Sequence, residues 1–269
     1  MWTFTSDPEE FAAVAEPFLL GDPVGNTVPL TVLANLRAGV PAKDAFFAWW
    51  TAGGQVRGVA FRTPPAPIGL TSMPVEAVAP LVAALDGDLP LVVGPVGLTS
   101  EVVRLLGEPD HLTSERLYRL GTLAVPPVPG RGRLAGPADF PLMVSWYQGF
   151  GEEVGHGIDH DVAERVAQRI AGRELFVWEA DGVPVSVAGL GRPAGGVCRV
   201  GPVYTPPSCR RRGYGAAVTA YATQAGLAER CEQVVLFTDL ANPTSNAIYQ
   251  AIGYEPVSDH ARLAYAGAR

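Results

Sequence analysis

The stretch that decides the fold is Gly201-Pro202-Val203-Tyr204-Thr205-Pro206-Pro207-Ser208-Cys209-Arg210-Arg211-Arg212-Gly213-Tyr214-Gly215-Ala216. A strand expected over residues 196–205 runs into a proline-rich turn, and a helix expected over residues 213–228 follows a loop with three arginines. The first N–H groups of a helix are unpaired and carry the positive end of its dipole. Because Gly213 and Gly215 lack a Cβ, phosphate oxygens can approach them closely. The stretch therefore predicts a diphosphate site, although it is neither a G-x-G-x-x-G loop nor a P-loop.

A second motif follows one helix and one strand later, and it reads Asn242-Pro243-Thr244-Ser245-Asn246-Ala247-Ile248-Tyr249-Gln250-Ala251-Ile252-Gly253-Tyr254. Asn is a favourable N-cap and Pro a favourable first residue of a helix. The sequence thus predicts a short helix over residues 243–251, with Tyr249 two turns into it. Taken alone, Tyr249 would be a packing residue whose hydroxyl reaches the surface.

Together the two motifs resemble the GCN5-related N-acetyltransferase (GNAT) superfamily. Its core pattern, Arg/Gln-x-x-Gly-x-Gly/Ala, is matched by Arg210-x-x-Gly213-x-Gly215, and Pro207 stands at the expected place before it. The family's last helix is matched by the second motif, with Ser245 as a mild departure at an alanine position. The resemblance covers the second half of the chain, from about Gly130 onward.

The resemblance implies an α/β fold, a GNAT-like mixed sheet flanked by helices. It also implies an enzyme that transfers an acetyl group from acetyl-CoA to an amine by direct attack on the thioester, with Tyr249 as the general acid. The residues expected to bind the CoA co-substrate are Val203, Tyr204, Thr205, Arg210, Arg211, Arg212, Gly213, Tyr214, Gly215, Ala216, Asn242 and Asn246.

The same resemblance implies how the chain would hold the thioester. A bulge near Gly201-Pro202 would separate two strands, and pantetheine would pair with the backbone of Val203 and Thr205. The Val203 N–H would stabilise the oxyanion. Tyr249 would protonate the thiolate, because a phenol (pKa ~10) and a thiol (pKa ~8.5) are close in acidity.

The general base is open at this point. The family often uses a Glu on its fourth strand or a water relay, and residues 197–200 contain no acid. The candidates are Glu152, Glu153, Glu179 or a relay of water.

Two further features carry less chemistry. His156 and His160 have the spacing of a metal pair on a helix. The glycines around them favour a loop, so no metal is expected. Cys209 is not expected to act as a nucleophile.

The two halves of the chain show a similar density of predicted elements. Three prolines lie within residues 126–130, which no helix or central strand tolerates. The expected domains are therefore residues 1–125 and 131–269, with 126–130 as a linker.

The second half predicts the order β-α-α-β-β-β-α-β-α-β. The first half reads as a degenerate GNAT-like domain that shapes the acceptor site. It ends in a strand expected over residues 117–125. Gly94-Pro95-Val96-Gly97 precedes a helix there but has no basic neighbour.

Charge and composition exclude several classes. The net charge is −7 without a basic run, which argues against nucleic-acid binding. The apolar runs are too short to span a bilayer, and the acidic N-terminus does not read as a signal peptide. Three cysteines without a close pair suggest reduced thiols in the cytoplasm. A small-molecule or peptide amine is the expected partner, and the sequence does not indicate an oligomeric state.

Two alternatives to amine acetylation stay open. A module that binds acyl-CoA without turnover, for example as a sensor, would not need a strand-four acid. An N-acyltransferase for another acyl-CoA would need only a different acyl pocket. Acceptor loops vary without leaving a motif, so the sequence does not decide between them.

Overall fold

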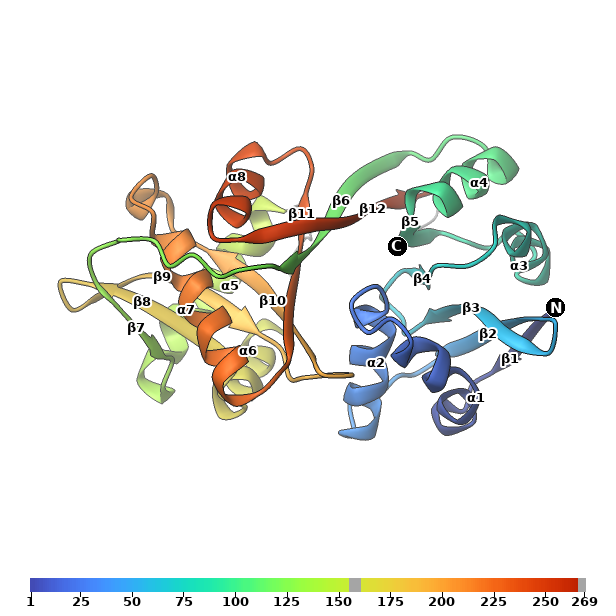
Figure 1. Ribbon diagram of the computed structural model, residues 1–269, viewed down its shortest axis with the longest axis horizontal. Helices are drawn as coiled ribbons and strands as arrows, with labels where there is room; N and C mark the ends of the chain where they lie inside the picture. Colours follow the sequence, from blue (N-terminus) through green and yellow to red (C-terminus); the bar gives the residue numbers. More distant parts are fainter. Residues whose placement is uncertain (155–160, 266–269) are drawn as a thin grey trace. The chain divides into compact units, whose positions relative to one another are not determined.

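The computed structural model describes residues 1–154 and 161–265, and its backbone divides into two compact units (Figure 1). The first unit holds residues 1–117, 238–242 and the end of the chain from Pro256. The second holds residues 118–237 and 243–255. The proline-rich segment 126–130 lies inside the second unit. The boundaries of these units therefore differ from those of the two continuous domains expected from the sequence. That division into domains stays a prediction.

The two halves of the chain repeat one order of elements. The first half consists of β1 (Trp2–Thr5), α1 (Pro8–Leu20), α2 (Thr27–Arg37), β2 (Phe46–Ala52), β3 (Gln55–Arg62), β4 (Ile68–Leu70), a 3₁₀ turn (Val75–Ala77), α3 (Val78–Ala84), β5 (Leu91–Pro95), α4 (Val96–Leu106) and β6 (His111–Leu120). The second half consists of β7 (Arg131–Leu134), a 3₁₀ turn (Pro137–Asp139), α5 (Phe140–Glu153), α6 (Val162–Ala171), β8 (Leu175–Ala180), β9 (Val183–Leu190), β10 (Val197–Tyr204), a 3₁₀ turn (Pro207–Cys209), α7 (Tyr214–Glu229), β11 (Gln233–Asp239), α8 (Pro243–Ala251) and β12 (Tyr254–Ala264). The order predicted for the second half is confirmed.

Strand pairing repeats as well. In the first half β1–β2, β2–β3 and β3–β4 are antiparallel and β4–β5 is parallel. In the second half β7–β8, β8–β9 and β9–β10 are antiparallel and β10–β11 is parallel. The α/β class and the mixed sheet are therefore as predicted, and each half has the same topology.

In the second unit, helices cover both faces of the sheet. Successive side chains of a strand point to opposite faces. Phe176 and Trp178 of β8 join the cluster that includes α7 and α8 residues, whereas Leu175 and Val177 join the cluster with α5 and α6. Figure 1 shows α7 lying across one face of β8 to β10. This helix is rich in Ala and Gly, which lets its backbone approach the sheet closely.

In the first unit, the same alternation places α1 opposite α3 and α4. Phe11 of α1 lies 5.0 Å, centroid to centroid, from Phe47 of β2. Ala48 of the same strand belongs to the cluster with α3 and α4 residues. The strand next to β5 in this unit is β12, paired from His260↔Pro95 to Ala264↔Leu91. Here the first unit takes its last strand from the end of the chain.

Two strands differ from the prediction. β6 spans His111–Leu120 rather than residues 117–125. The polar residues at the start of β6 show no strand pattern in the sequence. They form a strand because they pair with segments that are distant in the chain. β1, at Trp2–Thr5, was not predicted, because four residues are too few for an alternation to show.

Candidate functional site

The end of β10 separates from β11, as the family resemblance implies, and stays paired with β9. The pairing with β9 passes from Val200↔Leu190 to Val203↔Ala188, so one extra residue stands in β10 at Gly201-Pro202. The parallel pairing with β11 runs from Val197↔Gln233 only to Val200↔Leu236. The predicted bulge is confirmed, and the backbone from Gly201 onward lies beyond the β10–β11 ladder.

A buried hydroxyl fixes the last residues of this strand. Ser186 of β9 is fully buried, and its Oγ donates to the Tyr204 carbonyl at 3.0 Å. The same Oγ lies 2.8 Å from Thr205 Oγ1. Val203, Tyr204 and Thr205 are partly buried. Their backbone is thus held rigidly on the β9 side, which suits a binding edge on the other side.

The Tyr204 side chain does not face this edge. Its hydroxyl lies against Gly149 of α5, where an added Cβ would be 2.6 Å away. Its ring lies 6.4 Å from that of Trp146, and the Arg210 guanidinium is 5.9 Å from its centroid. Burial, and then the carboxylate of Glu153, raise the pKa of the Tyr204 phenol. Tyr204 therefore offers its backbone to the β10 edge and its side chain to α5.

The N-terminus of α7 is open to an anion. Arg211 and Gly213 both have left-handed backbones, with φ of 62° and 80°. This conformation turns the loop so that the helix starts at Tyr214. Among the described residues, no side chain caps the first turn, whose N–H groups precede the first helical bond from Ala217 N to Gly213 O at 3.0 Å. A Cβ on Gly215 would meet nothing nearer than Thr205 Oγ1, at 3.4 Å. Unpaired donors and an open approach are what a phosphate group needs.

The three arginines of the loop differ in surroundings. Arg210 Nε donates to the Thr205 carbonyl at 2.8 Å, and its guanidinium forms an ion pair with Glu153 at the end of α5. Arg210 therefore ties the loop to α5. Arg211 and Arg212 are exposed. Positive charge on these two side chains is available to a ligand phosphate.

Tyr249 lies in α8 with 9% of its surface exposed, in the cluster against which Val203, Tyr214 and Ala216 pack. Burial raises the pKa of Tyr249 to about 12. The phenol stays protonated at neutral pH, but its acidity is further from that of a thiol (pKa ~8.5) than the reference value suggests. A thiol in the same apolar surroundings also has a raised pKa, so the difference in pKa between the phenol and the thiol becomes smaller.

A buried tyrosine fixes α8. The Tyr118 hydroxyl donates to Asn246 Oδ1 at 2.9 Å and accepts from Gln250 Nε2 at 3.1 Å. Tyr118 is fully buried. Asn246, predicted to bind CoA, is thus engaged with β6. Asn242 is exposed, precedes α8 and is grouped with the first unit. The sequence analysis missed Tyr118, because its partners are far away in the chain.

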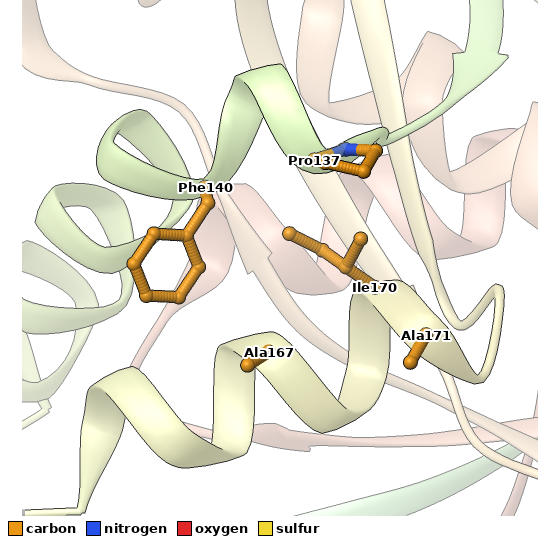
Figure 2. Close-up of a pocket in the computed structure, with 5 residues that line it drawn as sticks. All are labelled: Pro137, Phe140, Ala167, Ile170 and Ala171. Atoms are coloured by element: carbon orange, nitrogen blue, oxygen red, sulfur yellow. The ribbon is translucent and has the colours of Figure 1, made fainter.

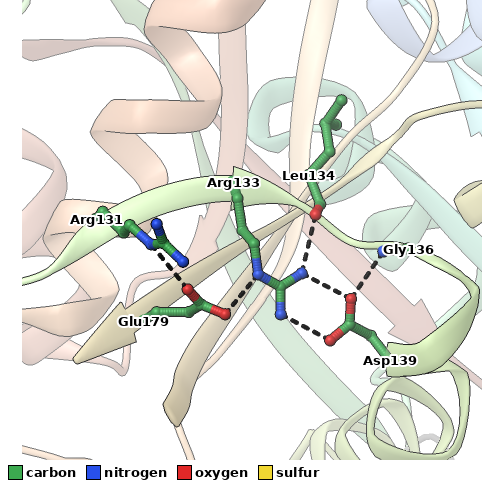
Figure 3. Close-up of polar contacts among 6 residues, drawn as sticks. All are labelled: Arg131, Arg133, Leu134, Gly136, Asp139 and Glu179. Atoms are coloured by element: carbon green, nitrogen blue, oxygen red, sulfur yellow. Dashed lines mark hydrogen bonds and ion pairs between the residues drawn. The ribbon is translucent and has the colours of Figure 1, made fainter. Parts of the chain in front are cut away.

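The three candidate bases differ sharply. Glu179 is 7% exposed, and Figure 3 shows its carboxylate between Arg131 Nε (3.0 Å) and Arg133 Nε (2.6 Å). Hydrogen bonds from Arg133 and Arg131 hold the pKa of Glu179 below its ordinary value. A weakened base in an ion-pair network is a poor proton acceptor, so Glu179 is better explained as a structural residue. Glu153 is paired with Arg210, and Glu152 is exposed beside it at the end of α5.

The sequence also singled out His156, His160 and Cys209. His156 and His160 lie outside the described residues. Cys209 is half-buried and free. Within residues 1–154 and 161–265, no group of three or more His, Cys, Asp or Glu is placed to hold a metal. None of the helices in the same residues is long and apolar enough to cross a bilayer.

A separate pocket of about 350 Å³ opens between the start of α5 and α6 (Figure 2). Its lining is Pro137, Phe140, Ala167, Ile170 and Ala171. These side chains carry no group that can ionise or accept a proton. The pocket can hold an apolar group, but it supplies no catalytic side chain.

Comparisons with known proteins bear on the family and the fold. Residues 141–254 match the model of the acetyltransferase (GNAT) family. Residues 141–254 therefore form a GNAT-family domain. No curated protein compared with the sequence matches it.

Solved GNAT structures resemble nearly the whole chain. A GNAT acetyltransferase from Colwellia psychrerythraea has a TM-score of 0.65 at 11% identity, covering 98% of this chain and 99% of its own. A GCN5-related N-acetyltransferase from Sphaerobacter thermophilus has a TM-score of 0.66 at 13% identity, covering 97% and 94%. A tandem GNAT protein from the clavulanic acid biosynthesis pathway has a TM-score of 0.54 at 13% identity, covering 98% of each chain. These likenesses show the fold, and the GNAT fold supports acyl transfer in general.

The first half of the chain has the GNAT topology but lacks a loop like the β10–α7 connection, with its arginines and glycines. The counterpart of the β10–α7 connection is the β4–α3 connection, residues 71–77, which contains no Gly and no Arg. Gly94 and Gly97, the glycines singled out in the sequence, lie instead at the β5–α4 junction, which corresponds to β11–α8. The first half therefore has no counterpart of the residues that would bind a diphosphate.

Proposed function

We propose that the second unit is an N-acetyltransferase that uses acetyl-CoA and transfers its acetyl group to an amine of a small molecule or peptide. The observation that carries this proposal is the combination of two features on one connection. The β10–β11 ladder ends at Val200, and the uncapped first turn of α7 begins at Tyr214. A free backbone edge followed by an anion site suits a pantetheine arm followed by a diphosphate.

The binding roles follow from this arrangement. The backbone of Val203 and Thr205 would pair with the pantetheine amides. The N–H groups of Tyr214, Gly215 and Ala216 would receive the diphosphate, because they are the first-turn donors without helical partners. Arg211 and Arg212 would add charge from exposed positions, and Gly213 would provide the turn. Arg210 would act mainly by holding the loop.

The chemical steps would be few. An amine in its neutral form attacks the thioester carbon, and the Val203 N–H stabilises the oxyanion. The C–S bond then breaks, and Tyr249 donates its proton to the sulfur. Glu152, or water held beside it, is the remaining acceptor for the proton that the amine loses. Glu153 and Glu179 are already engaged with arginines.

One alternative has a specific observation in its favour. A domain that binds acyl-CoA without turnover needs no base, and two of the three carboxylates predicted for that role are ion-paired. Tyr249, buried with a pKa of about 12, would then be a packing residue. A transferase for another acyl-CoA would keep every role above.

A thiol-release assay distinguishes these functions. The protein is incubated with acetyl-CoA and a panel of amines, beside a blank without amine, and free CoA is measured over time. Release that depends on the amine supports the transferase. Saturable acetyl-CoA binding with no amine-dependent release across the panel would favour the binding module. Release with propionyl- or succinyl-CoA but not with acetyl-CoA would show that the protein transfers a different acyl group.

A further inference from the structure

An arginine outside the loop contacts the bulge itself. Arg169 lies in α6, and its side chain is 15% exposed. Its Nη1 donates to the carbonyl of Gly201 at 2.9 Å and to the Tyr147 hydroxyl at 2.8 Å. The Gly201 carbonyl belongs to the extra residue of β10, which has no place in the regular ladder. A charged donor thus satisfies an acceptor that the bulge would otherwise leave without its strand partner.

On its Nε side the guanidinium has an ion-pair partner, although Nε itself makes no hydrogen bond. Arg169 Nε lies 3.4 Å from Glu174 Oε2, and the Glu174 N–H donates to the Arg169 carbonyl at 2.8 Å. Arg192 Nε contacts the other carboxylate oxygen of Glu174 at 2.9 Å. Arg169 and Arg192 share the single carboxylate of Glu174, which balances the Arg169 charge only in part. The hydrogen bonds of Nη1 are what direct the Arg169 side chain toward β10.

A glycine makes room for this contact. Gly189 lies in β9 opposite the bulge, between Leu190 and Ala188 of the two register pairs. A Cβ at Gly189 would be 2.6 Å from Arg169 Nη2 and 2.6 Å from the Gly201 carbonyl oxygen. Real Cβ atoms do not approach a backbone oxygen so closely, so any side chain at Gly189 would displace the carbonyl or the guanidinium. An isolated glycine inside a strand often marks such a close approach.

We propose that Arg169 is a positioning residue, which holds the Gly201 carbonyl toward α6 and so keeps the β10 backbone from Gly201 to Thr205 parted from β11. Gly189 supports the same arrangement, because it leaves room for the Gly201 carbonyl and the Arg169 guanidinium. The inference about the bulge rests on the geometry alone. Its consequence for acyl-CoA rests on the proposed function, because the same backbone is the expected pantetheine edge.

The test uses the full chain and four variants. Arg169→Met removes the donor and keeps an unbranched side chain, and Arg169→Lys keeps the charge. Gly189→Ala disturbs the same contact from the opposite strand and changes no residue of α6. Gln168→Met is the matched control, since Gln168 is the exposed neighbour on the same helix. Hydrogen exchange of the segment 199–206 is measured without ligand, and acetyl-CoA affinity is then measured by titration.

We expect exchange in the segment 199–206 to rise about ten-fold in Arg169→Met and Gly189→Ala, the scale of one lost charge-assisted hydrogen bond. Acetyl-CoA should bind about ten-fold more weakly to both variants, with partial recovery in Arg169→Lys and no change in Gln168→Met. Unchanged exchange in a folded Arg169→Met or Gly189→Ala protein would overturn the proposal. Faster exchange spread evenly over the second unit would also overturn it, because that pattern indicates general destabilisation. If the wild type does not bind acetyl-CoA, the proposed function fails, and exchange without ligand still decides the role of Arg169.

Discussion

Gly215→Glu is the substitution that tests the anion site most cleanly. Gly215 lies in the first turn of α7, and a Cβ there would meet only Thr205 Oγ1, at 3.4 Å, within a 4 Å radius. The side chain can therefore be added without breaking the loop. Gly213 is a poorer choice, because its φ of 80° strains any other residue and a Cβ would lie 2.9 Å from Val128 Cγ2. If a Gly213 variant lost binding, the result would not show whether the loop was distorted or the phosphate site was blocked.

The expected loss at Gly215 follows from charge. Two like charges about 4 Å apart repel by about 1 kcal/mol in water and about 4 kcal/mol near a protein surface. Those energies correspond to roughly 5-fold and 900-fold in affinity. We expect acetyl-CoA affinity to fall within that range, with a smaller effect at high salt because the site is exposed.

Gly215→Ala is the matched control for the helix. Alanine is favoured over glycine inside a helix by about 1 kcal/mol. This variant should therefore melt up to a few degrees higher than the wild type and keep its acetyl-CoA affinity, because the family pattern accepts Ala at this position and a Cβ has room there. Titration calorimetry and thermal melting of both variants check the two effects. Wild-type acetyl-CoA affinity in a folded Gly215→Glu protein would refute the assignment of α7 as the phosphate site.

Three further outcomes are expected. Tyr249→Phe should lower kcat by roughly 100-fold with little change in acetyl-CoA binding, because the ring stays in place and only the proton donor is lost; a wild-type kcat would remove Tyr249 from the mechanism. Tyr118→Phe should lower the free energy of unfolding by about 1–2 kcal/mol, measured by urea denaturation, since two hydrogen bonds to α8 are lost; an unchanged midpoint would mean that these bonds contribute nothing. Arg133 and Arg131 lower the folded pKa of Glu179, so its contribution to stability is present above its ordinary value of 4.5 and is lost as the pH falls through the lowered value. The wild type should therefore lose more stability between neutral pH and pH 3 than Glu179→Gln does, and equal losses would contradict this account.

Much of the second half could be predicted from the sequence, because its signals are local. Helix starts, turns and the run from Gly201 to Ala216 depend on residues close together in the chain. The bulge at Gly201-Pro202 was expected from the family resemblance that this run carries, and not from the two residues alone.

The supporting contacts could not be predicted in the same way. Arg169 reaches Gly201 across 32 residues, and Tyr118 reaches Asn246 across 128. Neither arginine nor tyrosine reveals such a partner by its spacing. Gly189 carried a usable signal, an isolated glycine in a predicted strand, but the sequence does not show what approaches it.

Glu179 shows a different limit. A carboxylate on a strand near the expected site is a reasonable base until its neighbours are known. Both arginines that neutralise it lie in β7, more than forty residues earlier. Burial and ion pairing decide its role, and both depend on how the strands are arranged in the sheet.

The pairing of β12 with β5 has a practical consequence. A fragment that starts at Pro129 would lack Tyr118 and its bonds to α8, and it would carry a β12 without the strand that it pairs with here. The full chain is therefore the right material for each measurement proposed above.

The most direct test of the central claim is a calorimetric titration of the full chain with acetyl-CoA, with ATP and NAD⁺ as nucleotides that also carry phosphates. The account predicts saturable binding of acetyl-CoA and CoA, and none of ATP or NAD⁺ at the same concentrations, because only the former carry a pantetheine arm for the β10 edge. Absence of acetyl-CoA binding at millimolar concentration, or equal binding of ATP, would contradict it.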